Sequence, residues 1–246
     1  RDMAFLTARW EHLVLRNYAC PPALLEPFVP SGTELDSWDG QTLISLVGFR
    51  FADTRLLGLP VPWHRTFEEV NLRFYVRRPG RVPRRAVVFI RELVPRWAIA
   101  TVARVVYNEP YVALPMRHHS CLTTNGGEVR YGWTHQRQDC ELGARVAGPP
   151  SALVSGSQAE FITEHYWGYT RQRDAGTLEY QVEHPPWRVW TTTDSWFIGS
   201  AAALYGPAFG AVLAGPTQST FVTLGSSVVV HHGRRIQTES AELQSD

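Results

Sequence analysis

The sequence predicts a mainly β protein, folded as a closed or nearly closed antiparallel barrel with a few helices on its outside. Aromatic residues make up 12% of the chain, including nine Trp, and aromatic rings pack well on pleated sheets. Apolar and polar residues alternate with a period of two along many segments, as expected for half-buried strands. A barrel removes exposed strand edges, and a wide barrel leaves room inside for a ligand.

In the first half of the chain, turn-forming residues bound the predicted elements. A short helix is expected over 21–28, because proline is favoured at the start of a helix. A strand over 43–51 follows a turn, and strands over 68–76 and 86–94 form a predicted hairpin. Apolar residues at helical spacing then predict a helix over 97–107.

The second half continues with further alternating segments and one stretch rich in Ala and Gly. The predicted strands span 113–119, 128–135, 166–173, 177–183, 188–193 and 221–231. The stretch 197–221 contains several glycines and a proline, which favours one or two short helices packed on the body over a membrane span. Segment 148–157 is too short to establish two domains. We therefore expect a single domain over 1–236 and a polar, disordered tail over 237–246.

The composition argues against several classes of function. All 24 basic side chains are arginine, and without a lysine amine neither Schiff-base chemistry nor a Walker-type phosphate site is available. A net charge of +1 argues against general nucleic-acid binding. Three Cys provide no disulfide framework, so the cytoplasm is the expected location. No metal or other cofactor is expected, because the chain has no HExxH, paired CxxC, GxGxxG or P-loop pattern.

The segment 68–76 carries an unusual row of polar side chains. Glu69, Asn71, Arg73 and Tyr75 share one face of the predicted strand, and apolar residues occupy the other. Such a row could line a pocket inside a barrel, where Arg73 would bind a carboxylate and Glu69 would transfer a proton. It could equally form a solvent-facing ladder paired with charges on the next strand. The sequence leaves these two alternatives open.

Two neighbouring segments add further candidates. In the strand 86–94, Arg91 and Glu92 are adjacent and point to opposite faces, so one of them should look inward and meet Glu69 or Arg73. After the predicted helix, Asn108 and Tyr111 are placed to orient a ligand. His118 follows as a candidate catalytic base, although a lone histidine is more often a structural group.

Four stretches of the chain carry a family resemblance. They read ARWEHLVLRNY, LISLVGFRFADTRLLGLPVPWHRTFEEVNLRFYVRR, VVFIRELVPRWAIATVARVVYNEPYVALPMRH and EHPPWRVW. Together they resemble the YqjF-like family of uncharacterised bacterial proteins, which is distantly similar to the acetoacetate decarboxylase-like superfamily. This resemblance implies a cone-shaped antiparallel β-barrel with the active site inside.

The resemblance also shows where this chain departs from the decarboxylases. Their pocket glutamate matches Glu69. Their Schiff-base lysine belongs to a doubled-lysine motif, and in the similar stretch here Met116 and Arg117 occupy the two lysine positions. Decarboxylation through a Schiff base is therefore not expected, although the barrel can be shared without the reaction.

These observations predict an internal pocket that binds a small organic acid or oxo compound. Arg73 and Arg117 would hold the anion, and Glu69 would act as acid or base. Three roles stay open at this point. The protein is a Schiff-base-independent lyase, isomerase or hydrolase, or a non-catalytic carrier or sensor, or a structural or interaction protein with no cavity. No membrane contact is expected, and assembly into a homo-oligomer is left open.

Overall fold

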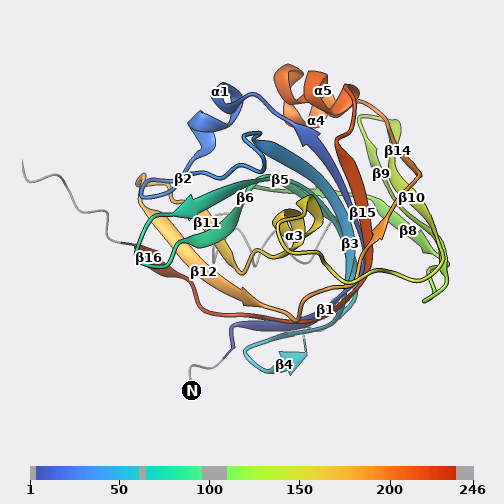
Figure 1. Ribbon diagram of the computed structural model, residues 1–246, viewed down its shortest axis with the longest axis horizontal. Coiled ribbons are helices and arrows are strands. Elements are labelled where there is room, and N and C mark those ends of the chain that lie inside the picture. The colour runs from blue at the N-terminus through green and yellow to red at the C-terminus, as the bar shows by residue number, and fades with distance from the viewer. Residues whose placement is uncertain (1–3, 61–64, 96–109, 237–246) are drawn as a thin grey trace, which may run out of the picture.

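The body of the molecule is a ring of β-strands. The computed structural model describes residues 4–60, 65–95 and 110–236. The ring runs in the order β15 (Ser219–Val230), β1 (Leu6–Ala19), β3 (Leu43–Leu56), β5 (Phe67–Arg78), β6 (Arg84–Pro95), β11 (Trp167–Arg171) and β12 (Thr177–Glu183). β12 then pairs with β15, where Val182 lies opposite Val230, and this pairing closes the ring (Figure 1). The predicted barrel is confirmed, with one parallel junction between β6 and β11.

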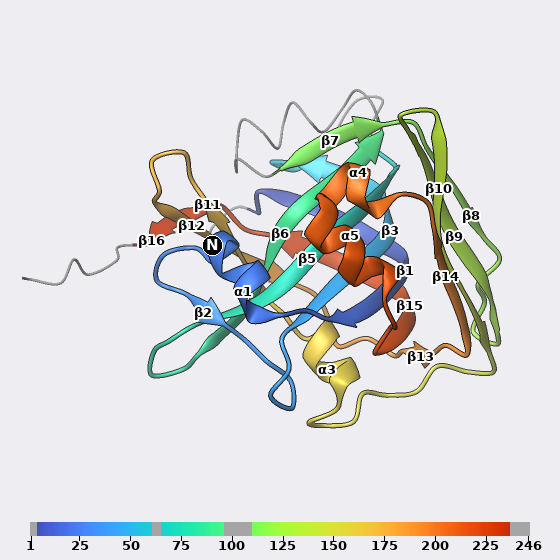
Figure 2. The ribbon, with the colours of Figure 1, turned by 90° about the horizontal axis from the view of Figure 1, so that it is seen from above.

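Most of the short helices lie outside this ring. α1 (Pro22–Leu25) continues into the 3-10 helix η1 (Glu26–Phe28), which confirms the helix predicted over 21–28. α4 (Ala201–Tyr205) and α5 (Pro207–Ala214) confirm the short helices predicted in the Ala- and Gly-rich stretch. Both pack on the outer side of the barrel, as Figures 1 and 2 show.

One helix, α3 (Gln158–Thr163), lies within the ring when the barrel is viewed as in Figure 1. It begins at Ser157, whose hydroxyl accepts a hydrogen bond from the Glu160 backbone N–H at 3.2 Å. This cap satisfies one of the free N–H groups at the start of the helix. Phe161 and Ile162 of α3 are buried and pack against inward-facing residues of the barrel.

A second antiparallel sheet covers part of the outer face. Its strand order is β14 (Asp194–Ile198), β10 (Gln138–Ala147), β9 (Gly126–His135) and β8 (Met116–Ser120). Tyr131 of β9 packs directly on Gly48 of β3, where an added Cβ would lie 2.7 Å from the Tyr131 ring. The absence of a side chain at Gly48 therefore allows the two sheets to approach closely.

The strand predicted over 113–119 is wrong as a single element. The structure divides it at Pro115 into β7 (Tyr111–Leu114), which runs parallel to β6, and β8, which belongs to the second sheet. Proline has no backbone N–H to donate to a ladder, so a sheet change at this position is favoured. The prediction over 188–193 is also too long, since only β13 (Trp190–Thr191) is a strand there.

β1 was not predicted as a strand, because its pattern of alternation is interrupted. The register with β3 shifts between Glu11 and Val14, and His12 has a φ of 56°. Gly225 of β15 lies opposite this irregularity, with a φ of 83°. A Cβ there would lie 1.9 Å from the Trp10 carbonyl oxygen, so only glycine fits. The prediction also missed five other strands, which are β10 and β14 of the second sheet together with β2 (Glu34–Leu35), β4 (Leu59–Pro60) and β16 (Arg234–Ile236).

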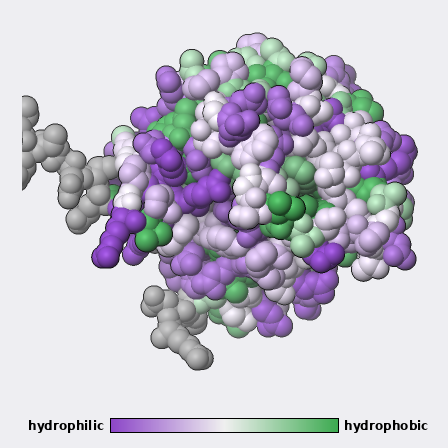
Figure 3. All heavy atoms as spheres, in the orientation of Figure 1, coloured by the Kyte–Doolittle hydropathy of each residue, from purple (hydrophilic) through white to green (hydrophobic). Residues whose placement is uncertain are grey.

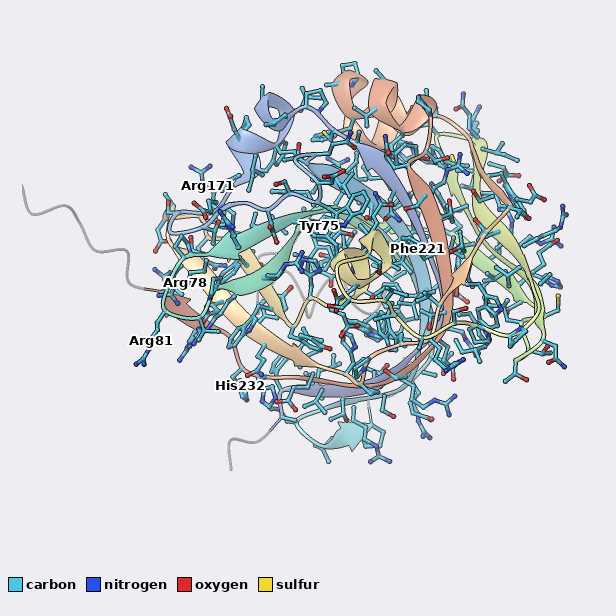
Figure 4. The ribbon with its side chains drawn as sticks, in the orientation of Figure 1. Tyr75, Arg78, Arg81, Arg171, Phe221 and His232 are labelled. Atoms are coloured by element: carbon cyan, nitrogen blue, oxygen red, sulfur yellow. The ribbon has the colours of Figure 1, made fainter. Side chains whose placement is uncertain are left out.

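A buried carboxylate joins several strands at one end of the barrel. The Glu179 side chain is 0% exposed, and it accepts hydrogen bonds from the Tyr169 hydroxyl at 2.7 Å, Arg84 at 2.6 Å and Arg234 at 2.8 Å. Arg78, marked in Figure 4, pairs with it at 3.2 Å. Burial raises the pKa of Glu179, but the hydrogen bonds outweigh burial and lower this pKa to about 2. Glu179 is therefore ionised at neutral pH.

Both faces of β5 are buried, so its row of polar side chains does not face solvent. Val70, Leu72 and Phe74 are 0% exposed and pack in the outer core with the second sheet and α4. Tyr75 belongs to the inner cluster, together with Phe161 of α3. The alternative of a solvent-facing ladder is therefore wrong, because the polar face of the strand points into the barrel.

The exterior is unremarkable in comparison. On the face shown in Figure 3, hydrophobic side chains appear as small separate areas among hydrophilic ones. Within the described part of the chain, every helix is too short or too polar to cross a membrane. The predicted helix over 97–107, Asn108 and the predicted tail over 237–246 lie outside the described residues. The site is therefore sought among the buried polar side chains inside the barrel, such as Glu69 and Asn71 of β5.

Candidate functional site inside the barrel

The polar row of β5 lies inside the barrel beside apolar neighbours. Glu69 is 3% exposed and Asn71 is 1% exposed. Glu69 lies opposite Phe49 of β3, and Phe67 is two residues before it on the same strand face. Phe49 and Phe67 both belong to the inner apolar cluster. A carboxylate in such surroundings is poorly solvated, so it holds its proton more tightly than in water.

A second carboxyl group meets Glu69. Glu92 of β6 is 2% exposed, lies opposite Asn71 in the β5–β6 ladder, and is hydrogen-bonded to Glu69. The Asn71 amide donates to Glu69 Oε1 at 2.9 Å. Burial raises the pKa of Glu69 to about 7, against the lowering effects of Asn71, Glu92 and the charge of Arg73. Because two adjacent carboxylates repel, the pair retains a proton near neutral pH.

The inward position of Glu92 confirms that one of the two adjacent residues on β6 looks into the barrel. A register shift between Leu72 and Arg73 displaces the β6 partners by one residue, so Arg91 faces Leu72 on the outer side. There its charge acts on Tyr205 of α4, opposing the rise in the Tyr205 pKa that burial causes. Arg91 therefore does not contribute to the interior site.

Arg73 supplies a positive charge next to this carboxyl pair. Its Nη2 donates to the Ile162 carbonyl of α3 at 3.3 Å. Within the described residues, the buried Arg73 Nε and the buried Asn71 Oδ1 have no hydrogen-bond partner. An unmet donor and an unmet acceptor thus lie on the same strand face as Glu69. Such a group can hold a carboxylate or carbonyl oxygen at Arg73 and a hydroxyl at Asn71.

A chain of hydrogen bonds continues the polar row beyond Arg73. The Ser45 hydroxyl donates to Asn17 Oδ1 at 2.6 Å, and Asn17 donates to the Ser219 hydroxyl at 2.9 Å. The Tyr75 hydroxyl lies 2.5 Å from Ser45 Oγ. Because Ser45 has already used its proton, Tyr75 is the donor. The chain links β5, β3, β1 and β15 and fixes the phenol of Tyr75 in place.

Tyr75, labelled in Figure 4, in turn packs against Phe161 of α3. Its ring lies 5.2 Å from the Phe161 ring and 4.7 Å from the ring of His165, which follows the helix. Arg73 lies 5.8 Å from the Tyr75 ring centroid. Asn17, Ser45 and His165 were not among the predicted site residues. A lone Asn, Ser or His has no spacing pattern, so only the fold reveals this group.

Two further predicted residues, Arg117 and His118, lie apart from Glu69. Arg117 is on the second sheet, with a side chain that is 52% exposed and 3.4 Å from Asp139, so it cannot share an interior ligand with Arg73. His118 packs between the rings of His12 and Tyr131, at 5.8 and 5.3 Å, on the outer side of the barrel. Burial lowers the pKa of His118 to about 4.

Met116 and Tyr111, the remaining predicted residues within the described chain, lie in different places. Met116 packs against the outer core. Tyr111 of β7 is half-buried and lies opposite Glu92 in the parallel β6–β7 ladder, so its backbone lies beside the carboxyl pair. Over the described residues, no three His, Cys, Asp or Glu side chains are grouped so as to hold a metal ion.

Comparison with known proteins places this chain in a family. The model of the DUF2071 family, described as an uncharacterized conserved protein, matches residues 7–228. The chain belongs to the DUF2071 family. It is 29% identical over 184 residues to the uncharacterized protein YqjF of Bacillus subtilis (strain 168), covering 72% of each chain.

Solved structures identify the fold of this DUF2071 protein. It is similar to the enduracididine biosynthesis enzyme MppR complexed with pyruvate, with a TM-score of 0.66, 15% identity, and coverage of 96% of this chain and 91% of MppR. It is also similar to an acetoacetate decarboxylase from Legionella pneumophila, with a TM-score of 0.66, 12% identity, and coverage of 94% and 87%. The chain therefore has the acetoacetate decarboxylase-like fold, as its sequence resemblance implied.

Proposed function

We propose that this protein binds a small organic acid or oxo compound inside the barrel, between Arg73 and the Glu69–Glu92 pair. One observation carries the proposal. Arg73 Nε and Asn71 Oδ1 are both buried without a hydrogen-bond partner among the described residues, and they lie beside a buried carboxyl pair that retains a proton. Each buried polar atom left without a partner costs about 1–3 kcal/mol. A ligand with a carboxylate and a second oxygen would satisfy both atoms.

The carboxyl pair gives the bound molecule a partner for proton transfer. A group with a pKa of about 7, as Glu69 has, is populated in both its protonated and ionised forms at neutral pH. Glu69 can therefore remove a proton from carbon or oxygen of the ligand and return it. Arg73 would hold the ligand carboxylate and stabilise negative charge that develops on an adjacent oxygen. This chemistry fits a lyase, an isomerase or a hydrolase.

The comparison with MppR supports the choice of ligand class, because that enzyme is complexed with pyruvate, a small 2-oxo acid. The reaction must differ from Schiff-base decarboxylation, since this chain contains no lysine. Met116 and Arg117 stand in the stretch that resembles the doubled-lysine motif, and Arg117 faces solvent. Proton transfer at Glu69 is therefore the proposed route.

Proton NMR of the protein incubated with 2-oxo, 3-oxo and unsaturated carboxylic acids tests this proposal. We expect line broadening of at least one acid and its slow chemical conversion, with conversion lost in Glu69→Gln. Glu68→Gln is the matched control, since Glu68 is adjacent on the same strand but faces the outer side opposite Arg50.

Broadening without conversion would favour a carrier or sensor over an enzyme. If no acid broadens, the binding proposal fails. If Glu69→Gln retains full conversion, the role of Glu69 as acid or base fails.

A further inference from the structure

His165 is a buried histidine that the proposed chemistry leaves without a role. It lies just beyond α3, is 7% exposed, and its ring packs against Tyr75 at 4.7 Å and Phe161 at 5.5 Å. Neither ring nitrogen has a hydrogen-bond partner among the described residues. The Ile162 carbonyl lies near the ring and favours its charged form, but this effect is smaller than those of burial, Arg85 and Arg73. A buried imidazole with two unmet nitrogens is costly unless a ligand or water completes it.

Burial and the neighbouring positive charges keep the His165 ring neutral. Burial lowers the pKa of His165 well below its ordinary value, and the charges of Arg85 and Arg73 lower it further. A neutral imidazole presents one N–H donor and one acceptor nitrogen. His165 can therefore donate a hydrogen bond to an anion without carrying a charge itself.

Arg73 and His165 lie close enough for the Arg73 charge to act on the imidazole ring. Arg73 donates to Ile162, three residues before His165, and both side chains lie against the Tyr75 ring, with the Arg73 guanidinium 5.8 Å from its centroid. Arg85, the other nearby cation, is already paired with Asp36 at 2.8 Å. Arg73 is thus the cation whose buried Nε stays unmet beside His165.

We propose that Arg73 and His165 form a carboxylate subsite, in which Arg73 supplies the charge and the His165 ring supplies a directed N–H donor. This inference rests on the proposed function and adds an orientation to it. The ligand is an acid whose carboxylate points toward α3, while its remaining carbon atoms extend along β5 toward Asn71 and Glu69. His165 is then a ligand-binding residue that donates a hydrogen bond to the carboxylate of the ligand.

Titration calorimetry with pyruvate tests the subsite in wild type, His165→Phe, His165→Gln and Arg73→Gln. Phenylalanine keeps the ring against Tyr75 but removes the N–H, so we expect the Kd to rise about 10- to 100-fold, as for loss of a hydrogen bond to a charged group. Glutamine retains a donor and should restore most of the affinity. His119→Phe, at an exposed position of β8, is the matched control and should bind as the wild type does.

The outcomes separate this inference from the proposed function. Pyruvate binding that depends on Arg73 but is unchanged in His165→Phe would overturn the subsite and leave the proposed function intact. No binding of pyruvate to the wild type would overturn the subsite, whereas the proposed function fails only if none of the acids tested by proton NMR binds. If His165→Phe does not fold, ¹⁵N NMR of the wild-type histidine rings decides the question. A buried ring signal must then shift on addition of pyruvate, and an unchanged set of ring signals would refute the subsite.

Discussion

The raised pKa of Glu69 predicts a specific dependence of stability on pH. In the folded chain this pKa is about 7, against 4.5 for an ordinary glutamate. The folded state therefore binds the proton more tightly than the unfolded state. This preference stabilises the fold fully below pH 4.5 and is lost as the pH rises through 7. The loss amounts to about 3 kcal/mol, because each tenfold step in proton affinity is worth about 1.4 kcal/mol.

Urea unfolding at several pH values between 4.5 and 8.5 measures this effect. We expect the wild-type free energy of unfolding to fall by about 3 kcal/mol more across this range than that of Glu69→Gln, whose amide does not titrate. Glu68→Gln controls for the general charge change on β5, because Glu68 faces the opposite side of the strand. If wild type and Glu69→Gln have parallel pH profiles, Glu69 does not hold a proton near neutral pH, and the proposed acid–base role fails.

Three further predictions test the surrounding structure. Glu179→Gln should cost about 3 kcal/mol of unfolding free energy at pH 7. Because the Glu179 pKa is lowered to about 2, the cost should shrink as the pH falls from 4.5 toward 2, and an undiminished cost at pH 2.5 would contradict the ionised cluster. Gly225→Ala should lower the free energy of unfolding by about 2 kcal/mol or more, because its Cβ would lie 1.9 Å from the Trp10 carbonyl oxygen. An unchanged urea midpoint would refute the close approach. The His118 ring should titrate in NMR near pH 4, and a midpoint near 6.5 would show that it is solvated.

Much of the barrel could be predicted from local patterns. Strict alternation marked the β5–β6 hairpin, because each strand has one face in the outer core and one in the interior. β1 escaped prediction because the irregularity at His12 breaks its alternation, and the partner that tolerates it, Gly225, is more than 200 residues away. The second sheet was also missed, since nothing local shows that Pro115 carries the chain from one sheet to another.

The candidate site was only partly predictable for similar reasons. Glu69, Asn71 and Arg73 were identified because one strand carries all three at a spacing of two. That Glu92 rather than Arg91 faces inward depends on the register shift at Leu72–Arg73, which the sequence does not reveal. His165 lies about 90 residues beyond this strand, and α3 brings it to the inside of the barrel. Its place in the site is therefore visible only in the folded structure.

A crystal structure of the protein soaked with pyruvate tests the central claim most directly. The account predicts density for the acid inside the barrel, with its carboxylate within hydrogen-bond distance of Arg73 Nε and the His165 ring, and its remaining carbon atoms on the side of Glu69. Pyruvate bound only at the surface beside Arg117, or an interior without bound acid at saturating concentration, would contradict it.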